Sequence, residues 1–282
     1  MRVGYLGPEG TFSQEALMTA PDADGWEPVA LPTNHDTVIA VHDGTVDRAL
    51  VPIENSLEGA VNPTLDALAI ETDDVVIDGE LIHPIRHCLV AARPLELDAI
   101  RTVVSHPQAT AQCARFIRTR LGEVAVVPAA STAEAVRLVA EGSAPGDGPW
   151  VALGNRLAAD LYGCEILLAG VEDMAGNETR FVWIAPAGTG AGEHGPWKTS
   201  LVFWGMGSEA PGWLVRCLSE FAFRGVNLTR IESRPRKEGL GRYMFFLDLE
   251  GRETDTAVAG AIVGLRGQAE AVRVLGSYPA AP

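Results

Sequence analysis

The chain has 282 residues, 47% of them hydrophobic and 21% charged, which is the balance of an ordinary soluble globular protein of roughly two domains. Its net charge of −15 at pH 7 disfavours nucleic acid and anionic membranes as partners, because an overall negative field repels a polyanion. An anionic substrate would therefore need local positive groups, such as an arginine, a helix N-terminus or a cluster of backbone N–H groups.

The N-terminus and the cysteines both bear on the compartment. The stretch MRVGYLG predicts a core strand, and no window approaches about 18 continuous apolar residues, so we expect a cytoplasmic protein. The four cysteines, Cys88, Cys113, Cys164 and Cys217, are widely spaced and form no CxxC pair. They indicate neither a zinc site nor a disulfide framework, and we interpret them as small buried residues.

Short β-branched runs alternate with helical patterns over residues 1–185. Strands are predicted at 2–6, 48–53, 75–82, 85–92, 101–105, 124–128, 150–154 and 179–185, and helices at 13–20, 63–70, 107–121, 131–142 and 156–163. Ser131 and Glu134 form a predicted capping box, and Pro107 is placed where the first turn of a helix tolerates proline. The alternation is typical of an α/β domain with mostly parallel strands, whose binding loops lie at the carboxyl edge of the sheet.

A change of pattern follows this region. Residues 186–198 (PAGTGAGEHGPWK) are rich in glycine and proline and predict a linker. Beyond it, strands are predicted at 199–205, 226–235, 242–251 and 271–278, and helices at 211–225 and 253–267. This βαββαβ order over 199–282 predicts a small ferredoxin-like module. The strand at 242–251 is either central in its sheet or paired in a dimer.

Four polar stretches fall at the edges of predicted strands: GPEGTFS (Gly7–Ser13), ENS (Glu54–Ser56), SHPQ (Ser105–Gln108) and NETRF (Asn177–Phe181). In the first, Thr11 and Ser13 can help to form a carboxylate-binding nest, or Ser13 is an ordinary helix N-cap. His106 is either an acid or base near neutral pH or a helix cap. Each stretch alone is more typical of a turn, a cap or a strand entry. Together, with no metal cluster and no cofactor loop, they predict a cleft for a small polar molecule.

These stretches, in their order and spacing, resemble the catalytic domain of the prephenate dehydratase family, and ESRP at Glu232–Pro235 resembles that family's C-terminal ACT regulatory domain. The resemblance covers nearly the whole chain. It implies a catalytic domain at 1–185, built from two α/β lobes like a periplasmic binding protein, with the site in the cleft between them, and an ACT domain at 199–282. It also implies conversion of prephenate to phenylpyruvate with loss of water and carbon dioxide, without a cofactor or metal.

The resemblance assigns roles to residues of this chain. Thr179 would assist the leaving hydroxyl through an oriented hydrogen bond, because a threonine hydroxyl is too weak an acid to be a free proton donor at neutral pH. Arg180 either anchors the pyruvyl carboxylate or is structural, and Phe181 is expected to pack rather than react. Further contacts in the cleft are expected from Thr11, Ser13, Asn55, Ser56, Ser105, Gln108, Ser131, Thr132 and Asn177.

In the ACT domain the resemblance implies feedback by phenylalanine at an interface between two modules, which makes a homodimer the minimum and a homotetramer the alternative. The effector residues would be Gly212, Trp213, Leu214, Val215, Asn227, Leu228, Glu232, Ser233, Arg234 and Pro235. Trp213 stands where the family has alanine, and it either fills or reshapes the expected pocket. The alternative interpretation of ESRP, without a role in effector binding, is the end of a strand terminated by proline.

Two other functions stay open at this point. One is arogenate dehydratase, which performs the same elimination on the amino-acid analogue of prephenate. The other is a sensor that binds an amino acid without turnover, which the intact NETRF motif disfavours.

Overall fold

The computed structural model describes residues 1–21, 23–189, 195–205 and 210–281. The chain divides into two compact units, each assembled from separate segments. The first unit contains Met1–Thr37, Glu54–Gly59 and Ile82–Arg180, and the second contains Val38–Ile53, Ala60–Leu81 and Phe181–Pro282. Each unit therefore contains residues that lie far apart in the sequence.

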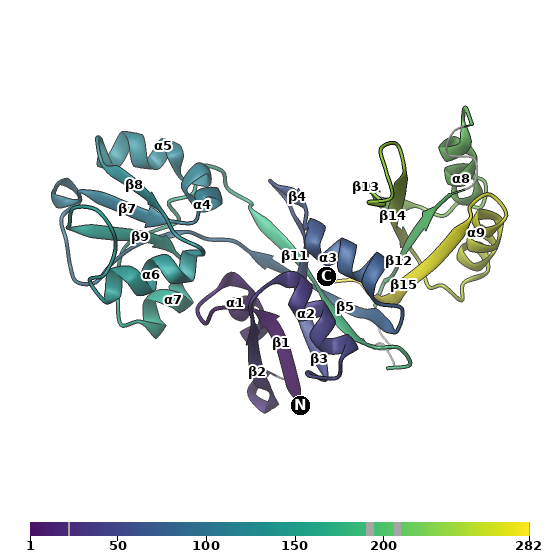
Figure 1. Ribbon diagram of the computed structural model, residues 1–282, viewed down its shortest axis with the longest axis horizontal. Coiled ribbons are helices and arrows are strands. Elements are labelled where there is room, and N and C mark those ends of the chain that lie inside the picture. The colour runs from purple at the N-terminus through teal and green to yellow at the C-terminus, as the bar shows by residue number, and fades with distance from the viewer. Residues whose placement is uncertain (22, 190–194, 206–209, 282) are drawn as a thin grey trace. The chain divides into compact units, whose positions relative to one another are not determined.

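The first unit contains two groups of strands (Figure 1). At the N-terminus β1 (Arg2–Leu6) pairs in parallel with β2 (Glu27–Leu31), with Val3 opposite Pro28. The second group is a five-stranded sheet in the order β10-β6-β9-β7-β8. Its strands are β6 (Cys88–Ala91), β7 (Thr102–Ser105), β8 (Ala125–Pro128), β9 (Trp150–Gly154) and β10 (Glu165–Ala169). The helices of this unit are α1 (Phe12–Met18), η1 (Ala23–Gly25), η3 (Leu97–Ala99), α4 (Pro107–Gln112), α5 (Ala114–Phe116), η4 (Ile117–Leu121), α6 (Thr132–Ala140) and α7 (Arg156–Leu161).

Helices cover both faces of the five-stranded sheet, because alternate residues of each strand point to opposite sides. Val104 and Ala152 pack against buried residues of α6 and α7. Val103 and Val151 point the other way and pack against Cys113 and other residues of the opposite layer. The burial of both faces explains why these strands are continuous apolar runs in the sequence.

Several elements continue from one unit into the other: α2 (Asn34–His42), β3 (Arg48–Asn55), β4 (Gly59–Ala60), β5 (Val75–Pro84) and β11 (Glu178–Pro186). Strands β3, β11 and β5 are neighbours in that order, and β4 pairs with β3. The adjacency of β3 and β11 brings the ENS stretch beside the NETRF stretch. The second unit also holds α3 (Asn62–Asp66) and η2 (Ala67–Glu71).

The C-terminal part of the second unit is a four-stranded antiparallel sheet in the order β13-β14-β12-β15. Its elements are β12 (Trp197–Trp204), α8 (Trp213–Ala222), β13 (Leu228–Pro235), β14 (Tyr243–Glu250), α9 (Thr256–Arg266) and β15 (Ala271–Pro279). Helices α8 and α9 lie together on one face of the sheet (Figure 1), and Phe203, Phe221 and Leu265 are fully buried in the core between the layers. The ferredoxin-like prediction is confirmed, and β14 is a central strand.

The structure differs from the expectations in three places. The predicted mostly parallel sheet is mixed, because β6 pairs antiparallel with both β9 and β10. The helix predicted at 107–121 is interrupted at Cys113, where the backbone leaves helical geometry at φ −115° and ψ 14°. The sequence also does not predict β2, α2 or β10. Pro28 within β2 argues against a strand, yet β2 lies at a sheet edge, where a missing N–H is tolerated.

The cysteines are free, and Cys88, Cys113 and Cys217 are buried while Cys164 is half-buried. Burial raises the pKa of the Cys113 thiol to about 12 and that of Cys217 to about 11, so both remain protonated at neutral pH. Within the described residues no helix is long and apolar enough to cross a membrane.

The predicted linker at 186–198 includes residues 190–194, which lie outside the described part of the chain.

Candidate active site

A chain of hydrogen-bonded side-chain amides in the first unit ends at Thr179. Asn55 ends β3, and Gln112 ends α4. Asn177 directly precedes β11, and Thr179 is the second residue of that strand. The backbones of the two strands are also joined, because the Ser56 N–H donates to the Glu178 carbonyl at 2.9 Å. These elements hold the side chains within hydrogen-bonding distance of one another.

The orientation of the Asn55 amide is fixed by its neighbours. Its Oδ1 accepts hydrogen bonds from the backbone N–H groups of Leu57 and Glu58, both at 3.0 Å. Because those groups can only donate, the opposite end of the amide must be the NH₂ group. That Nδ2 lies 2.8 Å from Asn177 Oδ1, 3.1 Å from the Glu178 carbonyl and 3.0 Å from Thr179 Oγ1.

Thr179 therefore accepts a hydrogen bond through its hydroxyl oxygen. The residue is 7% exposed, and within the described part of the chain no acceptor for its hydroxyl proton is found. A hydroxyl whose oxygen accepts one hydrogen bond still has its proton to donate. The arrangement makes Thr179 a hydrogen-bond donor aimed away from Asn55.

Gln112 holds Asn177 from the other side. Gln112 Nε2 donates to the Glu58 carboxylate at 3.0 Å, so Gln112 Oε1 is the acceptor end of this amide. That oxygen accepts from Asn177 Nδ2 at 3.1 Å and lies 3.0 Å from His87 Nε2. The hydrogen bonds thus run without interruption from His87 and Gln112 through Asn177 and Asn55 to Thr179.

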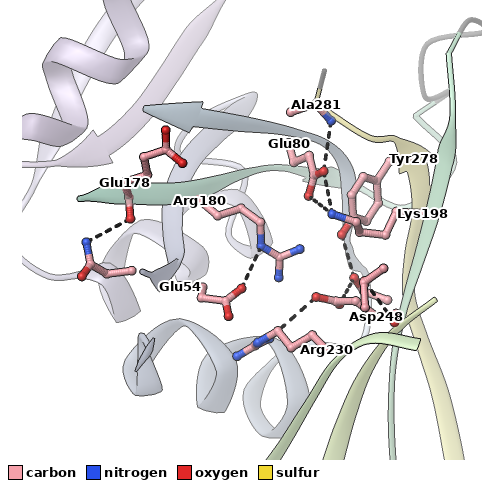
Figure 2. A network of polar contacts seen from close by, with 12 residues as sticks. Glu54, Glu80, Glu178, Arg180, Lys198, Arg230, Asp248, Tyr278 and Ala281 are labelled. Carbon is pink, nitrogen blue, oxygen red and sulfur yellow. Dashed lines mark hydrogen bonds and ion pairs between the residues drawn. The ribbon is translucent and has the colours of Figure 1, made fainter. Parts of the chain in front are cut away.

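Arg180 and Phe181 point to different surroundings from those of Thr179. Figure 2 shows the Arg180 side chain extended toward Glu54, and Arg180 Nε lies 3.3 Å from Glu54 Oε2. Phe181 is 2% exposed and is one of the largest fully buried side chains. Its burial agrees with a packing role.

The other predicted cleft residues form local contacts. Ser56 Oγ accepts from the Glu178 N–H at 2.9 Å, beside the amide set. The Ser105 hydroxyl donates to the Leu153 carbonyl and is fully buried, whereas Gln108 is exposed. His106 is the N-cap of α4 and accepts from the Gln108 N–H at 3.3 Å.

The GPEGTFS loop begins α1 differently from the expectation. Thr11, not Ser13, is the N-cap: it accepts from the Gln14 N–H and donates to the Leu6 carbonyl. Ser13 is buried inside the helix. A side chain at Gly10 would come within 3.2 Å of Ala158 and 3.5 Å of Ala133, so only glycine lets this loop approach the first turns of α6 and α7. Thr132 begins α6 at that approach, and its cap Ser131 accepts from the Glu134 N–H at 3.0 Å.

Two of the cavities lined by residues of the first unit differ in charge. One of about 280 Å³ is lined by Glu58, Gln112, Glu172 and Asp173 together with Leu57, Ala111 and Met174, and it is acidic. The other, of about 510 Å³, is lined by Glu15, His83, Pro84, Arg86, Cys88, Arg156, Ala169 and Gly170. Its two arginines make it the better of the two for an anion. Across the described residues there is no group of His, Cys, Asp and Glu side chains that could hold a metal ion.

Three members of the network were missed by the sequence interpretation: Gln112, His87 and Glu58. Gln112 lies four residues after Gln108 in SHPQATAQC, and helical spacing would have placed both on one face. No sequence signal distinguishes which glutamine points toward NETRF. His87 directly precedes the apolar run Cys88–Ala91, where a buried histidine is the ordinary interpretation.

The predicted effector residues lie on α8 and β13 or directly before them. Trp213 is 4% exposed, its ring packs 5.8 Å from Phe203 and 5.9 Å from Phe245, and its Nε1 donates to the Gln268 carbonyl. It is a core residue of the module. Arg234 of ESRP donates to both Asp66 oxygens, with Nη2 at 2.9 and 2.8 Å. Gly212, Val215, Asn227, Ser233 and Pro235 are exposed, while Leu214, Leu228 and Glu232 are half-buried.

Comparison with known proteins decides the family. A family model described as prephenate dehydratase matches residues 3–189. A curated prephenate dehydratase of Mycolicibacterium smegmatis is 40% identical over 288 residues, spanning 99% of this chain and 90% of the relative. The chain belongs to the prephenate dehydratase family.

Solved structures of this family have the same fold. A prephenate dehydratase from Arthrobacter aurescens, in complex with L-Phe, has a TM-score of 0.88 and 37% identity over 99% of this chain and 90% of its own. A prephenate dehydratase from Staphylococcus aureus has a TM-score of 0.82 and 27% identity, covering 99% of this chain and 100% of its own. A protein described as GqqA, a novel type of quorum quenching acylase, also matches, with a TM-score of 0.85 and 34% identity over 100% and 99% of the two chains. Relatives within one fold therefore have different described activities.

Proposed function

We propose that the protein is a prephenate dehydratase that converts prephenate to phenylpyruvate, carbon dioxide and water. The observation that carries this proposal is the hydrogen bond from Asn55 Nδ2 to Thr179 Oγ1, which leaves the threonine proton for the substrate. In the reaction the bond to the ring carboxylate breaks, and its electron pair enters the ring. The carbon–oxygen bond to the ring hydroxyl breaks at the other end with its electron pair leaving on the oxygen, which takes up a proton from the solvent to become water.

Thr179 supports this chemistry as a donor to the departing oxygen. Negative charge grows on that oxygen in the transition state, so a hydrogen bond held in place beforehand is stronger there than in the ground state. Loss of one such donor typically costs ~10²- to 10³-fold in turnover. Aromatisation and loss of carbon dioxide supply the driving force, so the chemistry needs no electron sink.

Arg180 has a structural role in this proposal. Its Nε is close to the Glu54 carboxylate, and an arginine held by an acidic partner is a weaker anchor for a substrate carboxylate. A tight grip on the carboxylate that departs would also slow the reaction. Ser56, Asn177 and Gln112 support Thr179, whereas Thr11, Ser13, Ser105, Gln108, Ser131 and Thr132 stay predicted cleft contacts.

The proposal extends to regulation and organisation. Residues 1–185 are the catalytic domain, 186–198 the linker and 199–282 an ACT domain that binds L-phenylalanine as a feedback inhibitor. The L-Phe complex of the Arthrobacter aurescens relative supports this ligand. Trp213 is larger than the alanine that the family has at this position, and we expect weak inhibition or altered selectivity. The enzyme would act in the cytoplasm as a homodimer or homotetramer, in the biosynthesis of phenylalanine.

Enzyme assays can distinguish three alternatives from this proposal. Arogenate dehydratase would perform the same elimination on arogenate, and a sensor would bind without turnover. An acylase, suggested by the description of GqqA, needs an activated nucleophile or bound water. Among the described residues the Ser105 hydroxyl donates to a backbone carbonyl and is not paired with a histidine, which gives this alternative no support.

The deciding experiment incubates the purified chain separately with prephenate, arogenate and an N-acylated homoserine lactone, with and without L-phenylalanine. Formation of phenylpyruvate from prephenate is the expected result. Turnover of arogenate alone, or of the acylated lactone alone, would replace the proposal by the corresponding alternative. Turnover of none of the three, with L-phenylalanine bound, would indicate a sensor.

A further inference from the structure

His87 is a buried histidine that the elimination itself does not use. It directly precedes β6, is 2% exposed, and packs edge-on against the Phe12 ring with 5.4 Å between ring centres. Its backbone N–H donates to Glu172 Oε2 at 2.9 Å. Its backbone and ring are thus both held in place.

The partners of the ring determine where its proton is. His87 Nε2 lies 3.0 Å from Gln112 Oε1, and Gln112 Oε1 is the acceptor end because Gln112 Nε2 donates to Glu58. Nε2 must therefore carry the hydrogen. Nδ1 is buried and has no hydrogen-bond partner among the described residues. The neutral Nε2–H tautomer is the form that this site accommodates.

Protonation of His87 would add an N–H at Nδ1, which is buried and has no acceptor among the described residues. Burial lowers the pKa of the imidazole below its ordinary 6.5, while the hydrogen bond to Gln112 and the Glu172 carboxylate oppose this shift. Arg86 Nη1, 3.0 Å from Glu172 Oε1, reduces the effect of that carboxylate. His87 is therefore a neutral donor at the pH of the cytoplasm.

We propose that His87 is a positioning residue for the elimination: its Nε2–H holds the Gln112 carbonyl and, through Asn177, keeps the Asn55 amide in place against Thr179. This inference rests on the proposed function. Glu58, the other group that orients Gln112, is exposed, so its hydrogen bond competes with water and constrains Gln112 less. The buried contact from His87 is the firmer constraint on the same amide.

The test compares two substitutions at one position. His87→Gln keeps an N–H donor near the place of Nε2, whereas His87→Phe keeps the ring volume and removes the donor. Because the network acts on a group that works in the transition state, His87→Phe is expected to lower kcat at least about tenfold with KM within about threefold. His87→Gln is expected to recover kcat to within about threefold of the unmodified enzyme. His42→Gln, at an exposed histidine of the second unit, is the matched control and should change neither constant.

Three results would overturn the inference. The first is a His87→Phe enzyme whose kcat equals that of the unmodified enzyme. The second is an equal loss of kcat in His87→Phe and His87→Gln, and the third is a His87→Phe enzyme in which only KM changes. If His87→Phe does not fold, His87→Asn replaces it, since its amide is too short to reach Gln112 and is expected to lose kcat. An unmodified enzyme without activity on prephenate would contradict the proposed function itself.

Nitrogen-15 NMR of the unmodified enzyme gives a readout besides activity. His87 should show a protonated Nε2 and an unprotonated Nδ1 near neutral pH, and the opposite tautomer would contradict the proposed geometry.

Discussion

Asn55 donates a hydrogen bond to Thr179, with 3.0 Å between Nδ2 and Oγ1, and its own carbonyl is held by two backbone N–H groups. The direction of donation is fixed by groups that can only donate, so the threonine oxygen is an acceptor and its proton is left over. This relationship is the part of the site that gives Thr179 a chemical direction.

Asn55→Asp tests that direction with an almost unchanged shape. The carboxylate can only accept, so it would take the Thr179 proton for itself and turn it away from the substrate. We expect kcat for prephenate to fall by ~10²-fold or more, at least as much as in Asn55→Ala. Steady-state kinetics on both variants checks this, with circular dichroism as the folding control. An Asn55→Asp enzyme that outperforms Asn55→Ala would show that the direction of this hydrogen bond does not matter.

The burial of His87 makes folding stability depend on pH. The pKa of His87 in the folded protein lies below the ordinary 6.5 of the unfolded chain, so the unfolded state binds this proton first as the pH falls. The contribution of His87 is full above 6.5 and is lost as the pH falls through the folded pKa. Urea unfolding of the unmodified protein and of His87→Gln at pH values from about 5 to 8 measures it. The difference in unfolding free energy between the two should shrink toward acid pH, and a constant difference would contradict the depressed pKa.

The strands that carry the site could be predicted from the sequence, whereas most of the side-chain contacts within the site could not. The ENS and NETRF stretches were predicted as polar strand edges, and β3 and β11 bring them together. Gln112 was missed in favour of Gln108 because both fit one helical face. Their difference depends on where α4 ends, and the break at Cys113 follows no propensity rule. Likewise α2 contains Thr37, Val38, Ile39 and Val41, which favour strands, so its helix is set by tertiary packing rather than by local preference.

Trp213, in the C-terminal ferredoxin-like module, is a second case in which the sequence did not predict the side-chain contacts. The sequence indicated a bulky residue near an effector pocket, whereas the structure places it in the core against Phe203 and Phe245. Trp213→Ala should therefore destabilise the protein by about 3–5 kcal/mol, and Trp213→Phe by clearly less. Urea unfolding monitored by circular dichroism measures both. A loss under about 1 kcal/mol in Trp213→Ala would mean that the tryptophan is not a core residue.

Arg234 and Asp66 link the ESRP motif to α3 within the second unit. Burial raises the pKa of the Asp66 carboxyl, but hydrogen bonds from Arg234 and Lys237 outweigh it and leave the pKa lowered. Asp66→Asn would weaken the hold on Arg234. If the proposed feedback is correct, uninhibited kcat should stay within about twofold while half-inhibition by L-phenylalanine shifts at least about fivefold. Inhibition curves for this variant and for Asp160→Asn, an exposed control, provide the test. Superimposable curves would exclude a regulatory role for the pair.

The central claim is that Thr179 donates a hydrogen bond to the departing oxygen. The most direct test compares kcat for prephenate in the Thr179→Ala and Thr179→Ser variants. The serine hydroxyl can still accept from Asn55 and donate to the departing oxygen, so Thr179→Ser should keep kcat within about tenfold of the unmodified enzyme. Thr179→Ala should lose ~10²-fold or more with unchanged folding. If Thr179→Ala turns over prephenate within about threefold of the unmodified rate, Thr179 is not the donor to the leaving group, and this account of the site is wrong.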